Sequence, residues 1–258
     1  MTSSVSVTDG ATRLLLERFI GDLRPLPSLV AVWAHGSLAG GDYRAGPSDL
    51  DLVAVLDRPC SPAEEAWLNA LHARLDAEVP SAARLHCSYL AAGELDDPDL
   101  RHLTWAHREL MRRPVTPVTR RELHAFGRVL SGPAPAGLLP PVTDRELAEF
   151  VAGDLRDYWR PALADPLRWR RDIWVDLGRL TLARATVTLR TGRLITKAEA
   201  VDVLAELGAP AELVADVRRR RYGRPAPVSE GWDTQRAELT RDFLGPAIDR
   251  ALAAAAGR

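Results

Sequence analysis

The pattern of apolar and polar positions changes about halfway along the chain. In the first half, short apolar runs alternate with stretches whose apolar residues recur at helical spacing. The stretch 99–130 mixes both patterns. The predicted strands lie at 29–34, 49–56 and 84–90, and the predicted helices lie at 12–23 and over about 17 residues from Pro62. Strands that alternate with helices in this way indicate an α/β domain.

The segment 131–141 is rich in Gly and Pro, which interrupt helices and strands. Thr143 and Glu146 follow it at the spacing of a capping box, which predicts the start of a helix. Helical periodicity continues from there, and the expected helices are 143–160, 172–191, 196–207, 210–221 and 232–254. We therefore expect an α/β domain over 1–141 and an all-α helical bundle over 142–258.

The composition excludes several classes of protein. Of 258 residues, 46% are hydrophobic and 27% are charged, and the formal net charge is −1. General binders of nucleic acid or membrane surfaces usually carry a strong basic excess. The four consecutive arginines at 218–221 point all around a helix and form no single basic face. No apolar run approaches the ~18 residues of a membrane span.

The N-terminal segment lacks the basic and apolar blocks of a signal peptide. The two cysteines, Cys60 and Cys87, are too few for a disulfide scaffold. The chain has neither a CxxC nor an HExxH motif, so a zinc site is not indicated. We expect a cytoplasmic monomer whose partners include neither nucleic acid nor membrane.

A pair of carboxylates at the start of the second predicted strand is the first indication of chemistry. Side chains at i and i+2 of a strand share a face, so Asp49 and Asp51 project together. Two such carboxylates repel each other unless a cation lies between them, and oxygen ligands favour Mg²⁺. Gly36 and Ser37, just before the intervening loop, could offer N–H groups and a hydroxyl to phosphate oxygens. The alternative is a turn residue followed by a solvated strand residue.

The composite of these features resembles the DNA polymerase β-type nucleotidyltransferase superfamily, whose signature is Gly-Ser followed by Asp-x-Asp. With Ser48 directly before the pair, Gly36-Ser37-(x)11-Asp49-Leu-Asp51 looks like the aminoglycoside adenylyltransferases that modify streptomycin and spectinomycin. The segments 129–133 and 191–197 sit where that family has comparable segments.

The resemblance implies a nucleotidyltransferase domain with a mixed sheet and flanking helices, followed by the helical bundle. It also implies that ATP and Mg²⁺ are used. Asp49 and Asp51 would then hold the metal, and Gly36, Ser37 and Ser48 belong to the expected nucleotide site.

Two basic residues of the helical half extend that site. Of the 34 lysines and arginines, only Lys197 is lysine, and it is predicted to lie in the first turn of a helix capped by Thr196 and Glu199. A cation there faces the positive helix end, and a bound phosphate would reverse the unfavourable interaction. The alternative is a solvated lysine.

Arg184 falls in the apolar seam formed by Ile173, Leu177, Leu180 and Val187. A charge on a buried stripe needs either a partner, such as Asp176, or a cleft. In the resembling family, an Arg and a Lys at the positions of Arg184 and Lys197 hold the triphosphate of ATP.

The chain departs from the family at a third carboxylate, a Glu that is proposed to take the proton from the attacking hydroxyl. His86 stands at that position in the third predicted strand. Either His86 serves as the general base, or the base has been lost and the protein binds nucleotide with little turnover. A carboxylate could also come from the following loop, whose acids are Glu94, Asp96, Asp97 and Asp99, but none of them shares the strand register.

The family implies an aminoglycoside-like acceptor and a role in antibiotic resistance, although the acceptor could instead be a protein or another metabolite. A polycationic acceptor needs carboxylates and an aromatic wall. The residues expected to provide them are Trp105, Glu109, Asp154, Asp157, Trp169, Asp172 and Asp176.

Overall fold

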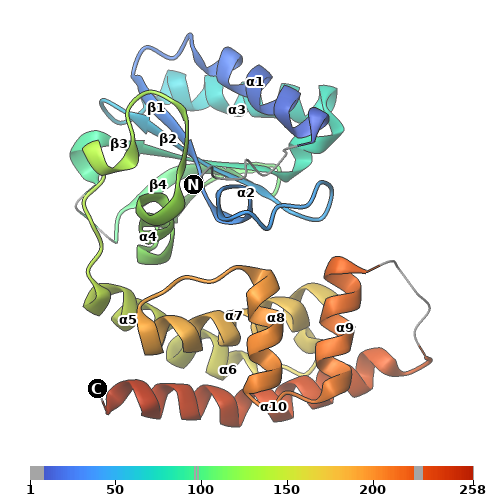
Figure 1. Ribbon diagram of the computed structural model, residues 1–258. Coiled ribbons are helices and arrows are strands. Elements are labelled where there is room, and N and C mark those ends of the chain that lie inside the picture. The colour runs from blue at the N-terminus through green and yellow to red at the C-terminus, as the bar shows by residue number, and fades with distance from the viewer. Residues whose placement is uncertain (1–8, 96, 98, 224–228, 258) are drawn as a thin grey trace, which may run out of the picture. The chain divides into compact units, whose positions relative to one another are not determined.

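The computed structural model describes residues 9–95, 97, 99–223 and 229–257. The chain forms two compact units, Met1–Val142 and Thr143–Arg258. The first unit is an α/β unit and the second is helical, as the ribbon in Figure 1 shows. The α/β fold with a mixed sheet, followed by an all-α region, confirms the predicted fold class.

A six-stranded sheet organises the first unit, in the order β5-β4-β3-β2-β1-β6. β2 and β3 run parallel, and every other neighbouring pair is antiparallel. The strands are β1 Leu29–Ala34, β2 Leu50–Leu56, β3 Leu85–Ala91, β4 Arg101–Ala106, β5 Glu109–Pro114 and β6 Arg128–Ser131. Because β2 and β3 are parallel and in register, Asp51 and His86 stand side by side near the start of their strands.

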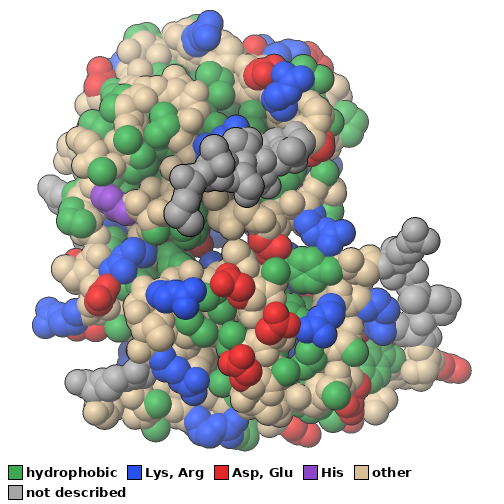
Figure 2. Space-filling model, in the orientation of Figure 1, with side chains coloured by type: hydrophobic (Ala, Val, Ile, Leu, Met, Phe, Trp, Pro, Cys, Tyr) green, Lys and Arg blue, Asp and Glu red, His purple; other side chains and the backbone are tan. Residues whose placement is uncertain are grey.

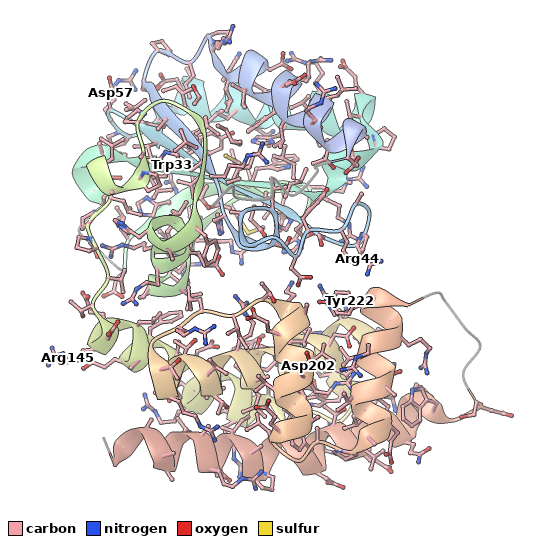
Figure 3. The ribbon with its side chains drawn as sticks, viewed as in Figure 1. Trp33, Arg44, Asp57, Arg145, Asp202 and Tyr222 are labelled. Atoms are coloured by element: carbon pink, nitrogen blue, oxygen red, sulfur yellow. The ribbon has the colours of Figure 1, made fainter. Side chains whose placement is uncertain are left out.

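Helices cover both faces of this sheet. The helices of the unit are α1 Gly10–Leu23, α2 Gly36–Gly40, α3 Pro62–Glu78 and α4 Pro117–Phe126. α1 and α3 pack on one face through leucines such as Leu15 and Leu71, against the Leu50, Leu52 and Leu56 side of β2. α4 packs on the other face, where Trp33 of β1 lies (Figures 1 and 3). The alternation of β2 thus separates its leucines from Asp51, as predicted.

The second unit consists of helices, of which α5, α8 and α10 pack on the central helix α7. They are α5 Asp144–Gly153, α6 Arg160–Ala162, α7 Asp172–Thr191, α8 Lys197–Glu206, α9 Ala211–Tyr222 and α10 Trp232–Ala256. The predicted capping box of Thr143 and Glu146 is present at α5. The helix predicted over 143–160 is not continuous, because a π-helical turn spans Asp154–Trp159 between α5 and α6.

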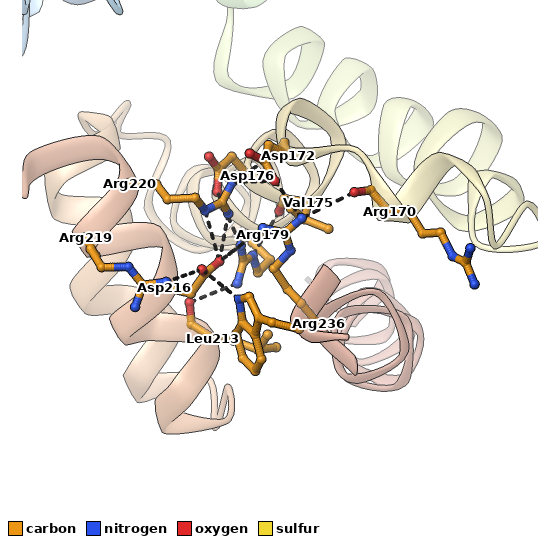
Figure 4. A network of polar contacts seen from close by, with 11 residues as sticks. Arg170, Asp172, Val175, Asp176, Arg179, Leu213, Asp216, Arg219, Arg220 and Arg236 are labelled. Atoms are coloured by element: carbon orange, nitrogen blue, oxygen red, sulfur yellow. Dashed lines mark hydrogen bonds and ion pairs between the residues drawn. The ribbon is translucent and has the colours of Figure 1, made fainter. Parts of the chain in front are cut away.

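A buried network of charges joins α7, α9 and α10 (Figure 4). Asp216 of α9 is fully buried and accepts from Arg179 of α7 at 3.2 Å and from Trp232 of α10 at 3.1 Å. Arg219 and Arg220 of its own helix also contact this carboxylate, each at 2.8 Å. Burial lowers the pKa of Arg179 and raises that of Asp176. Two of the four arginines at 218–221, Arg219 and Arg220, therefore bind a buried carboxylate of the unit, in line with the prediction that the four form no single basic face.

The structure corrects the apolar seam that was predicted around Arg184. Ile173 and Leu177 of the predicted seam are 60% and 38% exposed, so the seam is not a buried stripe. The arginine buried in α7 is Arg179, and Asp176 pairs with Arg179 and Arg220. The predicted seam is wrong because α7 contacts several helices. Its sequence therefore has apolar residues on more than one face, and helical spacing alone does not show which face is buried.

The surface agrees with the near-neutral net charge. On the face that Figure 2 shows, basic and acidic side chains are interspersed rather than gathered in one patch. Within the described ranges, no helix combines the length and apolar character needed to cross a membrane.

Candidate active site

The turn between β1 and α2 holds Gly36 close beneath the carboxylate of Asp51. Gly36 has φ +60°, and a Cβ on it would lie 2.6 Å from Asp51 Oδ2. The N–H of His35 donates to the backbone carbonyl of Asp51 at 2.9 Å, which ties the turn to β2. Glycine is therefore required at position 36 both for its conformation and for space. The Gly-Ser pair, predicted to open a loop, instead begins the short helix α2.

A carboxylate that the sequence did not indicate braces this turn. Glu122 of α4 is 6% exposed, and its Oε2 accepts the N–H of Gly36 at 3.2 Å and lies 3.2 Å from His35 Nδ1. The N–H of Gly36, expected to contact phosphate, is therefore bonded within the protein. The sequence did not indicate a role for Glu122, because it is one of several charged residues in the stretch 99–130, where helical and strand patterns are mixed. Its contact with Gly36 joins positions 86 residues apart.

The loop from Gly41 to Asp49 closes on itself before β2. The hydroxyl of Ser48 accepts the N–H of Arg44 at 3.1 Å, and the Ser48 N–H donates to the Arg44 carbonyl at 3.0 Å. Ser48 is buried, and Arg44 marks this loop in Figure 3. Ser48 thus braces the loop that leads to the Asp pair. Ser37 lies in α2, where its carbonyl accepts the N–H of Asp42 at 3.0 Å.

The two aspartates differ in position. β2 begins at Leu50, so Asp49 precedes the strand rather than belonging to it. Its carboxylate is 40% exposed and lies 3.4 Å from Arg84 Nη1. Asp51, 32% exposed, lies inside the strand with Oδ1 3.6 Å from His86 Nδ1. Both carboxylates are therefore partly open to solvent at one edge of the sheet, next to cationic or imidazole groups.

His86 occupies the neighbouring strand position, directly beside Asp51. Its side chain is 16% exposed, and its ring lies edge-to-face against that of His107, with centroids 4.9 Å apart. The separation of 3.6 Å from Asp51 is an electrostatic contact rather than a hydrogen bond. The structure thus brings Asp51 and His86 together, and it adds His107, which the sequence did not single out.

The loop carboxylates considered as replacements for a third acid lie elsewhere. Glu94, Asp97 and Asp99 follow the end of β3, whereas His86 is near its start. The five residue steps from His86 to Ala91 span about 16 Å in a strand. Glu94, Asp97 and Asp99 therefore follow the end of β3 that lies opposite to the end where His86 stands beside Asp51, in agreement with their lack of a shared strand register. Asp96 lies outside the described residues.

The two basic residues of the second unit lie near each other. Arg184 of α7 is half-buried, and its Nε donates to the carbonyl of Ile195 at 2.9 Å, two residues before Lys197. Lys197 is the first residue of α8, whose capping box of Thr196 and Glu199 is present as predicted. The N–H of Thr196 donates to the Glu199 carboxylate and holds its pKa below the ordinary value.

Most of the acceptor-binding candidates have other partners. Trp105 and Trp169 are buried in the cores of their units, with Trp105 stacked on His72 at 4.8 Å. Asp172 and Asp176 belong to the arginine network, and Asp157 pairs with Arg156. Asp154 accepts from Trp159 Nε1 at 2.9 Å. The expected aromatic wall is therefore not formed by these tryptophans, because both serve as core residues.

The donor set at the sheet edge fits Mg²⁺ only if a substrate completes it. Among the described residues, no group of three or more His, Cys, Asp or Glu side chains is arranged to hold a metal ion. Mg²⁺ commonly takes one or two carboxylates and fills its shell with water and substrate phosphates. The partly exposed oxygens of Asp49 and Asp51 match that role. Cys87 belongs to the core on the leucine side of β2 and Cys60 packs against that core, where burial raises the pKa of their thiols to about 12 and about 11.

The chain is similar to known proteins in its fold and not in its sequence. No protein-family model matches the chain, and no curated protein sequence matches it. Among solved structures, it is similar to the spectinomycin adenyltransferase AAD(9) from Enterococcus faecialis, crystallised with ATP and spectinomycin. The TM-score is 0.68 at 14% sequence identity, and the match covers 92% of this chain and 98% of that one. The chain therefore shares the fold of that adenyltransferase over most of its length.

Proposed function

We propose that the chain is a nucleotidyltransferase that moves the adenylyl group of ATP to a hydroxyl of an aminoglycoside-like small molecule. The observation that carries the proposal is the edge of the sheet, where the Gly36 turn lies beneath Asp51 and His86 stands beside it. The similarity of the whole fold to an adenyltransferase supports the same chemistry.

In this reaction the acceptor oxygen bonds to the α-phosphorus of ATP. The bond between the α-phosphorus and the oxygen that links it to the β-phosphate breaks, and pyrophosphate leaves. His86 is proposed to take the hydroxyl proton at Nε2, since its Nδ1 faces Asp51. Ser37 would donate to a phosphate oxygen, with the Ser48 loop holding Asp49 in place. Gly36 provides the space for this arrangement rather than a donor.

Asp49 and Asp51 are the residues proposed to hold Mg²⁺, which would neutralise phosphate charge when bound together with ATP. Arg184 and Lys197 are proposed to neutralise the triphosphate, since Lys197 begins α8, a helix start suited to an anion, and Arg184 of α7 donates to Ile195 just before it. Catalysis would then come mainly from positioning and charge neutralisation.

A pyrophosphate-release assay with ATP, Mg²⁺ and a panel of aminoglycosides tests the proposal. Asp51→Asn should lower release by about 100-fold or more, as expected for losing one preorganised charge. Asp57→Asn is the matched control, because Asp57 is an exposed aspartate just beyond the other end of β2 and should release pyrophosphate like the parent. Equal rates for Asp51→Asn and the parent would contradict the proposal.

The role of His86 has its own test. His86→Ala should cut the rate by about 10²–10⁴-fold and leave ATP affinity nearly intact, the pattern of a lost general base. His86→Glu places the carboxylate of the resembling family there and should recover part of the rate. An unchanged rate in His86→Ala would remove His86 from the mechanism.

The role of Lys197 is tested by calorimetry of ATP binding. Lys197→Ala should weaken binding because an ammonium at a helix start attracts phosphate. Lys197→Arg keeps the charge and should bind more like the parent. Arg193→Ala removes an exposed cation from the preceding turn and controls for general electrostatics. Equal affinity of Lys197→Ala and the parent would exclude contact with the phosphates.

The replacement of the family's third carboxylate by His86 favours one alternative, a nucleotide-binding protein with little turnover. Tight ATP binding without pyrophosphate release on any aminoglycoside would support this alternative. Release with a protein or another metabolite as acceptor would keep the chemistry and change the substrate.

A further inference from the structure

The hairpin between β4 and β5 turns through two residues that adopt an unusual backbone conformation. Ala106 pairs with Glu109, which leaves a two-residue turn of His107 and Arg108. Their φ angles are +54° and +68°, and among the described residues they are the non-glycine positions with positive φ. Positive φ at both turn positions is the type I′ geometry, in which Asn and Gly are strongly preferred. Neither residue is the Asn or Gly that this turn prefers, and Arg108 in particular holds a conformation unfavourable for its type.

Each of these residues makes a contact that glycine or asparagine could not make. Arg108 forms an ion pair with Asp76 of α3, with Nε at 2.8 Å and Nη2 at 2.6 Å from the same oxygen. This contact ties the hairpin to α3. His107 places its ring edge-to-face against His86, with centroids 4.9 Å apart and planes at 68°. One turn residue therefore anchors the hairpin, and the other reaches the candidate active site.

The contact matters because the histidine side chain has a loosely defined ring orientation. The χ2 torsion of histidine is broad and roughly two-fold, so a flipped ring would place a carbon where Nδ1 faces Asp51. Asp51 favours the observed orientation by attraction across 3.6 Å, which is too long to hold the ring by itself. The His107 ring, packed edge-to-face at 68°, limits how far the His86 ring can rotate about χ2 away from the orientation in which Nδ1 faces Asp51.

We propose that His107 is a positioning residue that holds the His86 ring with Nδ1 toward Asp51 and Nε2 toward the acceptor. The proposal rests on the proposed nucleotidyltransferase function and on the role of His86 in it. His107 does not exchange the proton itself.

The turn supplies a matched pair of variants. His107→Asn and Arg108→Asn each introduce a residue suited to positive φ, so both should preserve the hairpin. His107→Asn alone removes the ring beside His86. His107→Phe keeps an aromatic ring without imidazole nitrogens. The readouts are kcat, KM for ATP, and the NMR signals of the His86 ring in histidine-labelled protein, assigned with His86→Ala among the six histidines.

His107→Asn should shift the His86 ring signals and lower kcat by roughly tenfold, with KM for ATP unchanged, because the base is misaligned while the nucleotide site is intact. Arg108→Asn should change neither, and His107→Phe should restore most of the rate. Unchanged His86 signals or kcat in His107→Asn would overturn the proposal. So would equal losses in His107→Asn and His107→Phe, or in the two asparagine variants. If the parent itself releases no pyrophosphate, the proposed function fails, and the role of His107 fails with it.

Discussion

At the scale of single residues, the candidate site depends on side chains that brace one another rather than on isolated motif positions. Gly36 lies beneath Asp51, Glu122 holds the Gly36 N–H, and His86 stands beside Asp51. Phe126, one turn of α4 beyond Glu122, lies 3.5 Å from the space that a Cβ on Gly40 would fill. α4 therefore supports α2 at both of its ends.

Glu122 gives a prediction about this support. Glu122→Leu should destabilise the protein by about 1–3 kcal/mol, because the part-buried N–H of Gly36 loses its acceptor. It should also weaken ATP binding, since the turn beside Asp51 is released. Glu122→Gln keeps an acceptor oxygen in nearly the same shape and should retain more of both properties. Denaturant unfolding and ATP calorimetry measure the two effects, and equal behaviour of the two variants would contradict the bracing role.

At the scale of helices and strands, the charge network of the second unit holds α7, α9 and α10 together (Figure 4). Asp216 is its centre, and Arg179 beside it is also fully buried. Removing one partner of a buried ion pair leaves an uncompensated charge, which is far more costly than losing an exposed pair. The network therefore makes the packing of these helices sensitive to single charge changes.

Asp216→Asn should lower the free energy of unfolding by roughly 3–5 kcal/mol, because Arg179 loses a buried counter-charge. Asp202→Asn is the matched control. Asp202 of α8 pairs with Arg218 of α9 at 2.7 Å, but both side chains are largely exposed, so little change is expected. Urea denaturation of the two variants compares them directly, and similar stabilities would show that the network does not stabilise the unit.

Secondary structure was largely predictable at this scale. The strand at 29–34 matches β1, and the helices at 62 and 172–191 match α3 and α7. Such elements follow from local periodicity and capping residues. Two features were missed. α2 has five residues and one buried apolar residue, too few to show a period, and the π-helical turn at Asp154–Trp159 buries Leu155 and Trp159 at ordinary helical spacing.

At the scale of the whole molecule, stability should depend on pH through the core of the first unit. His72 is 2% exposed, packed against Phe19 and Trp105, and its Nε2 lies 2.6 Å from the Tyr89 hydroxyl. Burial lowers the pKa of His72 to about 3. Because the unfolded chain binds this proton near pH 6.5, the free energy of unfolding should fall as the pH drops from 6.5 toward 3, by up to ~1.4 kcal/mol per pH unit.

Comparison of His72→Gln with the parent isolates the contribution of His72 to the pH dependence of the free energy of unfolding, because glutamine can accept a hydrogen bond from Tyr89 but does not titrate. The parent should lose more stability than the variant between pH 7 and pH 5, measured by denaturant unfolding at each pH. His102, whose pKa burial also lowers, remains in both proteins and cancels in the comparison. Parallel losses in the two proteins would show that His72 does not carry the acid sensitivity.

The sequence by itself determined the α/β and helical halves, the main elements, and the motif residues Gly36, Asp49 and Asp51, because periodicity, caps and short motifs are local properties. It also indicated His86 as the departure from the expected acid. Only the tertiary structure decided which distant residues meet these positions. The parallel register of β2 and β3 placed His86 beside Asp51, α4 brought Glu122 to Gly36, and the β4–β5 hairpin brought His107 to His86. Strand order and packing set these contacts, and one-dimensional periodicity does not encode them.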